Sequence, residues 1–252
     1  MSRLEQRIEN AKKAGRYALI PFITAGFPTM ERFRAALREL DDCGADIIEI
    51  GIPFSDPVAD GPVVEEASRR VLEAGMNLRR VLEELQNSTF QAGIVLMGYY
   101  NPFLQYGLDK LAHICQQIGV EGIIVPDLPL EEAAPLRALL QARNIDLISL
   151  VSPNTSDERM REYNEVSRGY IYVVSVMGTT GVRGALAPAA AETLQRAQNN
   201  FNIPVALGFG LHEPAQVAKL EIKPDALVFG SALLQHLDSG AHAKDFMRPW
   251  LK

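Results

Sequence analysis

ADIIEIGIPFSDPVADGP, from Ala45 to Pro62, joins a short apolar run to a loop rich in proline and glycine. The run from Asp46 to Ile50 shows no alternation of polar and apolar residues, which is typical of a strand covered on both faces. Strands are covered in this way when helices pack on both sides of a parallel sheet. This stretch therefore predicts one strand–helix unit of an α/β protein.

The same kind of run recurs along the whole chain. Seven further runs are Ala18 to Thr24, Gly93 to Met97, Gly122 to Val125, Asp146 to Val151, Ile171 to Ser175, Pro204 to Gly208 and Ala226 to Phe229. Most of them start about 22 to 33 residues apart, which is the size of one βα unit. Eight units within 252 residues favour a closed (β/α)8 TIM barrel over an open doubly wound sheet. Because no linker divides the chain, we expect one barrel domain over residues 1–252.

Segments with helical periodicity separate these runs. Apolar residues spaced by three and four from Met30 to Leu40 predict one helix. The longest gap, between the second and third strands, predicts an extra helix from Val63 to about Ala74. We also expect Ser156 to begin a helix. The pair Glu131–Glu132 is expected in the first turn of the helix that contains Leu136 to Leu140, because negative charge there complements the helix dipole.

Composition and charge limit the class of protein. The formal net charge is −6, with 47% hydrophobic and 22% charged residues, as in an ordinary soluble globule. Mild acidity disfavours nucleic acid or an anionic membrane as the main partner. The N-terminal residues 1–16 lack the apolar stretch of a secretion signal, and no apolar run approaches the roughly 20 residues of a membrane span. Two cysteines without a CxxC pair suit a reducing compartment, so we expect a cytoplasmic protein.

Metal and nucleotide motifs are not found in the sequence. The four histidines show no ligand spacing, so no metal site is expected. No GxGxxG follows a predicted strand, and neither GxxxxGK[ST] nor GxSxG occurs, which disfavours nucleotide-binding and α/β-hydrolase functions.

Glu49 is the first candidate catalytic residue. It lies near the end of a predicted strand whose neighbours are isoleucines, and active sites of (β/α)8 barrels form at that end. A buried carboxylate without a partner is costly, so desolvation should raise the pKa of Glu49 into the range where it can give and take protons. The alternative is a structural glutamate held in a salt bridge, although no cation occurs in the same stretch.

Asp60 and Asp56 lie in the loop that follows. Several prolines restrain this loop, so its shape is held. A second carboxylate in a different environment is a recurrent arrangement for acid–base chemistry. Turn-forming aspartates beside proline and glycine are the alternative. Spacing leaves the two interpretations balanced for Asp60 and favours a turn role for Asp56.

Glycines follow the last three predicted strands. GFG (208–210) follows the seventh, and Gly230–Ser231 follows the eighth and opens a helix. Barrel phosphate sites form at these two loops, and exposed N–H groups at a helix start favour an anion. No lysine or arginine cluster is present, so backbone amides are expected to hold the phosphate. Tight turns alone are the alternative. The loop from Met177 to Gly184, after the sixth strand, is interpreted as a closing lid or a surface loop.

Several motifs together resemble one enzyme family. PFITAGFP (21–28), ADIIEIGIPFSDPVADGP (45–62), MGYYNPF (97–103), GIIVPDLPLEE (122–132), GYIYVVSVMGTTG (169–181), GFG and FGSAL occur in the order found in tryptophan synthase α subunits. The resemblance covers nearly the whole chain. It implies a (β/α)8 barrel lyase of tryptophan biosynthesis that cleaves indole-3-glycerol phosphate to indole and glyceraldehyde 3-phosphate. It also implies a β subunit that carries pyridoxal phosphate, in an α2β2 heterotetramer, and no cofactor in this chain.

The resemblance also implies roles for individual residues. Glu49 matches the proton-shuttling acid/base, and Asp60 matches the carboxylate that holds the indole N–H. Phe22 and Tyr172 match residues that line the substrate cavity. The remaining matches are the lid threonine Thr180, the phosphate-binding Gly181, Gly210, Gly230 and Ser231, and the residues facing the β subunit, Asp56, Asn101 and Pro102.

Other functions remain compatible with this pattern. The chain could be another phosphate-binding barrel, such as an isomerase or a synthase, but the IPFSDPVADGP loop argues against this. It could be a stand-alone lyase that releases free indole. It could also be an activator subunit with weak activity of its own, although both candidate carboxylates are present.

Overall fold

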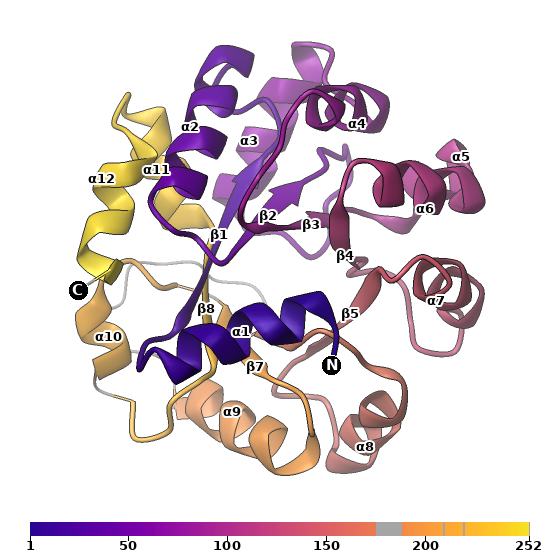
Figure 1. Cartoon of the computed structure of the whole chain (residues 1–252), viewed down its shortest axis with the longest axis vertical. Coiled ribbons are helices and arrows are strands. Elements are labelled where there is room, and N and C mark those ends of the chain that lie inside the picture. The colour runs from indigo at the N-terminus through magenta and orange to yellow at the C-terminus, as the bar shows by residue number, and fades with distance from the viewer. Residues whose placement is uncertain (175–187, 209, 219, 252) are drawn as a thin grey trace.

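Eight parallel strands close into a barrel in the order β1 to β8 (Figure 1). The computed structural model describes residues 1–174, 188–208, 210–218 and 220–251. The strands are β1 (Ala18–Thr24), β2 (Ile47–Gly51), β3 (Gly93–Met97), β4 (Val120–Ile124), β5 (Asp146–Val151), β6 (Ile171–Val174), β7 (Val205–Gly208) and β8 (Ala226–Phe229). The sequence-based prediction of a (β/α)8 barrel is therefore confirmed.

Helices surround the barrel (Figure 1). They are α1 (Arg3–Lys13), α2 (Met30–Asp42), α3 (Pro62–Glu73), α4 (Leu78–Gln86), α5 (Tyr100–Tyr106), α6 (Leu108–Gln117), α7 (Ala134–Gln141), α8 (Asp157–Val166), α9 (Pro188–Asn200), α10 (Pro214–Ala218), α11 (Ser231–Asp238), α12 (Ala243–Met247) and the 3₁₀ helix η1 (Arg248–Leu251). Side chains of Ser2, Thr29, Asn77 and Ser156 accept hydrogen bonds from the first turns of α1, α2, α4 and α8. These caps satisfy N–H groups that have no partner within the helix.

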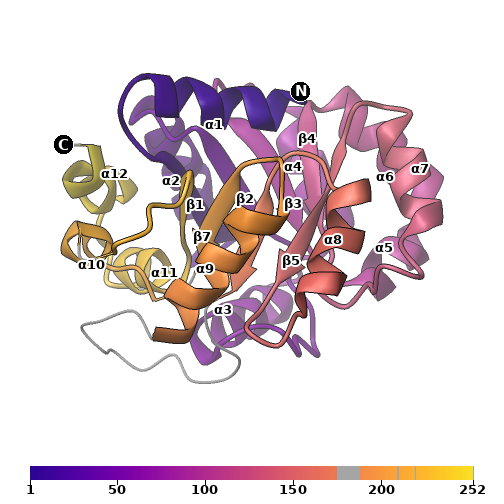
Figure 2. The same ribbon diagram turned by 90° about the horizontal axis from the view of Figure 1, so that it is seen from below.

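The barrel interior is apolar, and α1 closes one end of it. Ile20, Ile47 and Val95 point inward and pack in one cluster with Leu4 and Ile8 of α1. Each fully buried aliphatic side chain contributes about 1.5–3 kcal/mol. Figure 2 shows α1 across one end of the barrel and α3 near the other. The carboxyl ends of the strands, and hence the loops that form active sites in this fold, lie at the end opposite α1.

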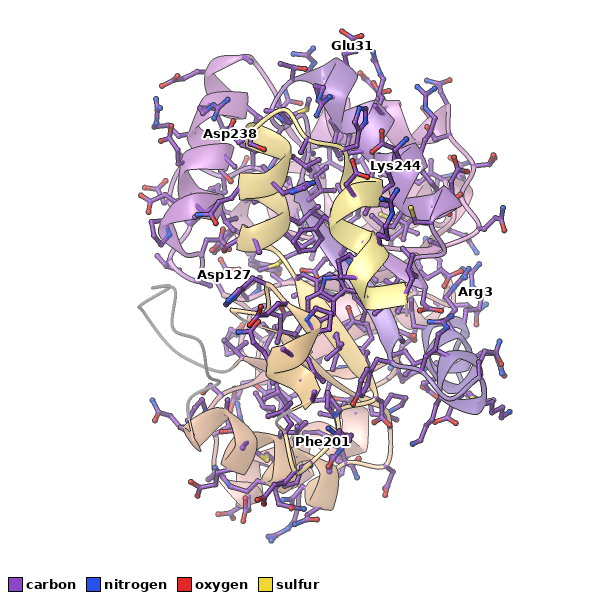
Figure 3. All side chains as sticks on the ribbon, turned by 90° about the vertical axis from the view of Figure 1, so that its left-hand side faces the viewer. Arg3, Glu31, Asp127, Phe201, Asp238 and Lys244 are labelled. Atoms are coloured by element: carbon purple, nitrogen blue, oxygen red, sulfur yellow. The ribbon has the colours of Figure 1, made fainter. Side chains whose placement is uncertain are left out.

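Charged pairs hold α1 in place. Arg7 donates Nε to Glu121 Oε2 at 2.8 Å and Nη2 to Glu121 Oε1 at 2.9 Å, and its Nη1 donates to the Gln91 carbonyl at 2.7 Å. Glu121 is the second residue of β4 and is buried. In Figure 3, Arg3 of α1 and Asp127, which follows β4, lie at opposite ends of the barrel.

Two expectations about helices are confirmed and one is wrong. The extra helix between the second and third strands is α3, and Ser156 caps α8 as predicted. Glu131 and Glu132, however, do not lie in the first turn of a helix. They lie in a turn that precedes α7, which begins at Ala134. Glu131 instead pairs with Arg159 of α8, so its charge serves an ion pair rather than a helix dipole.

Candidate active site

Glu49 lies in β2 and is almost completely buried. Its exposed fraction is 1%, and within the described part of the chain its Oε2 has no hydrogen-bond partner. Burial, with a smaller contribution from the negative charge of Asp60, raises the pKa of Glu49 to about 8. Among the described residues no cation pairs with it, which argues against a structural salt bridge. At neutral pH this carboxyl group holds a proton that it can donate.

Asp60 lies in the loop between β2 and α3. Burial raises the pKa of Asp60 to about 6; the Tyr99 hydroxyl opposes this shift, and the charge of Glu65 adds to it. Asp60 therefore stays mostly ionised at pH 7, while Glu49 stays mostly protonated. The charge of Asp60 acts on Glu49, so the two carboxyl groups lie close together, which favours a site role for Asp60 over a plain turn aspartate.

The loop that carries Asp60 is fixed by Tyr99. Its hydroxyl accepts a hydrogen bond from the Ala59 N–H at 2.9 Å, and its ring stacks on Phe54 with centroids 5.1 Å apart. The Asp60 N–H also donates to the Pro57 carbonyl at 3.1 Å. Sequence reasoning missed Tyr99 as a site residue, although it lies two residues after the end of β3 at Met97.

Two tyrosines extend toward Glu49. Burial and the charges of Glu49 and Asp60 raise the pKa of Tyr172 well above its usual value. Burial and the charge of Glu49 do the same to the pKa of Tyr170. The Tyr170 hydroxyl is buried and has no hydrogen-bond partner among the described residues. The family resemblance identified Tyr172, but the sequence analysis missed Tyr170, which directly precedes β6 and lies outside the predicted run.

Phe22 and Tyr172 both lie against glycines. A Cβ atom placed on Gly208 would overlap the hydroxyl and ring of Tyr172. Likewise, one placed on Gly51 would lie 2.5 Å from Phe22 Cζ. Phe22 is also the register partner of Glu49 in the pairing of β1 with β2. Aromatic side chains from β1 and β6 are thus available to bind a flat apolar ring near Glu49.

The loops after β7 and β8 offer backbone groups. Gly210 has a left-handed φ of 67°, and no atom of the described residues lies within 4 Å of the position that a Cβ would take there. Its carbonyl accepts hydrogen bonds from His212 Nδ1 and Gln216 Nε2, each at 2.9 Å. Gly230 precedes α11, which starts at Ser231 and has no side-chain cap. Uncapped N–H groups at a helix start suit an anion. The buried Gln216, which sequence reasoning missed, holds the first of these loops.

Two groups of candidate residues remain: those in the predicted lid and those predicted to face a partner. Thr180 and Gly181, with the whole segment from Met177 to Gly184, lie outside the described residues. Asp56 and Asn101 are exposed, and Pro102 is half-buried in α5. Asp56 accepts a hydrogen bond from the Ser55 hydroxyl at 2.5 Å. Beside them are two exposed apolar side chains, Val58 at 85% and Leu104 at 50%.

The described residues contain neither a metal-binding cluster nor a membrane-spanning helix. No group of three or more histidine, cysteine, aspartate or glutamate side chains in that part of the chain could hold a metal ion. None of its helices combines the length and the hydropathy needed to cross a bilayer.

Comparisons with known proteins agree with one another. The family model described as "Tryptophan synthase alpha chain" matches residues 8–248. The tryptophan synthase alpha chain of Nitratidesulfovibrio vulgaris is 60% identical over 99% of this chain and 98% of its own length, and that of Desulfovibrio desulfuricans is 59% identical over 99% and 100%. A Mycobacterium tuberculosis tryptophan synthase structure matches with a TM-score of 0.90 at 34% identity, covering 99% of this chain and 95% of the matched chain.

Proposed function

The chain belongs to the tryptophan synthase alpha chain family, and from this premise we propose how its residues carry out the family's reaction. The chain is a carbon–carbon lyase of tryptophan biosynthesis (EC 4.2.1.20, the α reaction). It cleaves indole-3-glycerol phosphate to indole and glyceraldehyde 3-phosphate. The observation that carries the residue assignment is the buried carboxyl group of Glu49, whose Oε2 has no hydrogen-bond partner among the described residues and whose pKa is about 8.

Glu49 gives one proton and takes one in each turnover. The protonated carboxyl first donates its proton to indole C3, which leaves positive charge on the indole nitrogen. The resulting carboxylate then removes the proton of the adjacent glyceryl hydroxyl. The electrons of that O–H bond form the aldehyde C=O, and those of the breaking C–C bond return to the indole ring and neutralise its nitrogen. Glu49 ends protonated, so the cycle needs no other acid or base.

Asp60 stabilises the charge that develops at the indole N–H. Because the pKa of Asp60 is about 6, its carboxylate is ionised when Glu49 is not. A fixed anion in a site of low polarity stabilises a developing cation more than water would. Tyr99 restrains the Asp60 loop through the hydrogen bond from Ala59, so the carboxylate is held before the substrate binds.

The remaining residues bind the two ends of the substrate. Phe22 and Tyr172 line the indole part of the cavity. Backbone N–H groups of Gly181, Gly210, Gly230 and Ser231 hold the phosphate without a lysine or arginine. Thr180 belongs to a lid that closes over the substrate. The uncapped start of α11 and the space beside Gly210, which no described residue fills, support this phosphate site.

The partner is a tryptophan synthase β subunit, and we place the contact on the loop around Asp56 and on the first turn of α5, with Asn101 and Pro102. Exposed apolar side chains are typical of protein interfaces, and Val58 and Leu104 lie beside these residues in sequence. The assembly is an α2β2 heterotetramer in the cytoplasm, to which this chain contributes one barrel domain. Pyridoxal phosphate belongs to the β subunit, and the α reaction at Glu49 requires no cofactor.

One experiment tests this function and separates it from that of a stand-alone lyase. Turnover of indole-3-glycerol phosphate by the isolated chain is measured first, and purified β subunit is then titrated in. We expect slow indole release by the isolated chain and a large rise with β subunit. High turnover that the β subunit leaves unchanged indicates a stand-alone lyase. An isolated chain and a complex that both fail to cleave the substrate would refute the function.

A further inference from the structure

Phe22 and Gly51 occupy neighbouring strands at the carboxyl end of the barrel. In the pairing of β1 with β2, Phe22 lies opposite Glu49, and Thr24 lies opposite Gly51. A Cβ atom placed on Gly51 would lie 2.5 Å from Cζ and 2.8 Å from Cε2 of Phe22. Non-bonded carbon atoms prefer separations of about 3.5–4.0 Å. The tip of the Phe22 ring therefore fills the space that a side chain at position 51 would need.

Gly51 is not required here for its backbone conformation. It is absent from the glycines with positive φ, so an alanine could adopt the same backbone without strain. The requirement at position 51 is for space alone. This separates Gly51 from Gly210, whose φ of 67° disfavours any side chain.

The other end of the Phe22 side chain lies beside Gly230. A Cβ atom on Gly230 would lie 3.4 Å from Phe22 Cδ1, an ordinary packing distance. Phe22 thus extends from the residue that precedes α11 to the strand that carries Glu49. Its exposed fraction is only 6%, and the surrounding core is closely packed. A Cβ at position 51 would therefore displace the Phe22 ring from its place beside Glu49.

We propose that Gly51 is a positioning residue for the reaction. Because it lacks a side chain, it lets Phe22 lie flat beside Glu49, and this sets the room left for the indole ring between the anion site at Gly230 and the carboxyl group. The proposal rests on the proposed function, because it places Phe22 in the wall of the substrate cavity.

The test compares Gly51→Ala in two backgrounds, with Phe22 and with Phe22→Leu. A leucine lacks the Cζ and Cε atoms that a Cβ at position 51 would overlap. With Phe22 present, we expect Gly51→Ala to raise KM for indole-3-glycerol phosphate about tenfold or more, with a smaller fall in kcat. With leucine at position 22, the same substitution should change KM by less than about twofold. A purely structural role for Gly51 would show no such rescue.

Gly98→Ala is the matched control. A Cβ there would lie 2.7 Å from Phe103 Cζ and 3.0 Å from the Ile52 Cβ, so its nearest neighbours are Phe103 of α5 and Ile52 after β2 rather than Phe22. Its effect on KM should be the same in both backgrounds. If Gly51→Ala alone does not fold, the double variant should fold and match Phe22→Leu, and a double variant that also fails to fold overturns the proposal.

Two results would overturn the role of Gly51. One is an equal change in KM caused by Gly51→Ala in both backgrounds, and the other is no change in either. Both leave the proposed function intact, provided the wild-type chain cleaves the substrate. A wild-type chain that releases no indole, alone or with β subunit, refutes the proposed function instead and removes the basis for the proposed role of Gly51.

Discussion

Glu49 and Asp60 differ in pKa in the order that the reaction requires. Burial places the pKa of Glu49 near 8 and that of Asp60 near 6, so the active form with one proton on Glu49 dominates between these values. We expect kcat/KM to rise as Asp60 ionises near pH 6 and to fall as Glu49 loses its proton near pH 8. Steady-state rates of indole release between pH 5 and 9.5 would measure both limbs.

The variant Asp60→Asn checks the assignment of the two limbs. It should lower kcat/KM and abolish the limb near pH 6, because no group ionises there. It should also move the upper limb to lower pH, since the negative charge of Asp60 raises the pKa of Glu49. An upper limb that stays in place or moves to higher pH would contradict the assignment.

Glu49→Gln should reduce turnover while increasing stability. Loss of this acid–base group is expected to lower kcat by about 10² or more. The folded state holds the proton of Glu49 more tightly than the unfolded state, in which the pKa of this group is about 4.5. Wild-type stability from this group is therefore present below pH 4.5 and falls as the pH rises to about 8. Glutamine removes this loss, so the free energy of unfolding above pH 5 should rise by up to a few kcal/mol.

Urea unfolding of both chains at pH 5, 7 and 8.5 measures this difference. The stability gained by Glu49→Gln should grow with pH. A gain that is independent of pH would show that glutamine acts through packing rather than through the proton. Near-normal cleavage by the purified variant would show that Glu49 is not the proton shuttle.

The sequence alone identified some of these residues as site residues but not others. Glu49 could be identified because isoleucines surround it in the chain, and a carboxyl group there has to be buried. Asp60 could not be separated from a turn aspartate, because its surroundings include Tyr99, which follows β3 and is distant in the sequence. The contact between Phe22 and Gly51 depends on strand register, which spacing along the chain does not reveal.

At the scale of elements, α11 offers a test of the phosphate site. Ser231→Asp places a carboxylate in the first turn of this uncapped helix. The negative charge should stabilise the helix by about 0.3–1 kcal/mol and repel the substrate phosphate. We expect KM for indole-3-glycerol phosphate to rise about tenfold or more, with the melting temperature unchanged or higher.

Ser239 provides the control because it caps the other end of α11. Ser239→Asp should lower stability slightly, since negative charge opposes the dipole there, and should leave KM unchanged. Equal effects of both substitutions on KM would argue that the helix start does not hold the phosphate.

The helix α1 stabilises the barrel from the end opposite the site. Arg7→Ala leaves the buried Glu121 without its bidentate partner, although Arg3 lies within 3.6 Å of the same carboxylate. We expect a loss of about 2–3 kcal/mol in urea unfolding, with kcat near the wild-type value. Arg69→Ala, which removes exposed pairs to Glu66 and Glu73 on α3, should have little effect. Equal losses for the two variants would contradict a special role for the α1 contact.

Strand positions were predictable, but helix starts were less so. Each strand requires a run of apolar residues on both faces, so its limits in the sequence agree with the structure to within about two residues. Glu131 and Glu132 misled the analysis because a turn and a helix start share the same acidic residues. The ion pair of Glu131 with Arg159 depends on how α8 packs, which periodicity does not encode.

At the scale of the whole molecule, the exposed apolar residues near the site predict where the β subunit binds. Leu104 and Val58 lie on segments that follow β3 and β2 at the carboxyl end of the barrel, whereas Leu251 is 45% exposed in η1. Leu104→Asp places a charge in an interface whose core should be dry, which costs affinity. We expect about a tenfold or greater weakening of β-subunit binding, with indole release by the isolated chain unchanged.

Val58→Asp should also weaken β-subunit binding. Because Val58 lies two residues from Asp60, turnover of the isolated variant has to be measured first. Leu251→Asp is the control, since it adds the same charge to an equally exposed leucine away from the proposed interface. Titration calorimetry gives the affinities, and the rise in indole release on adding β subunit gives the functional effect. If Leu251→Asp weakens binding while Leu104→Asp does not, the β subunit contacts a different face of the barrel. The rise in indole release caused by the β subunit then cannot pass directly through the loop that carries Asp60.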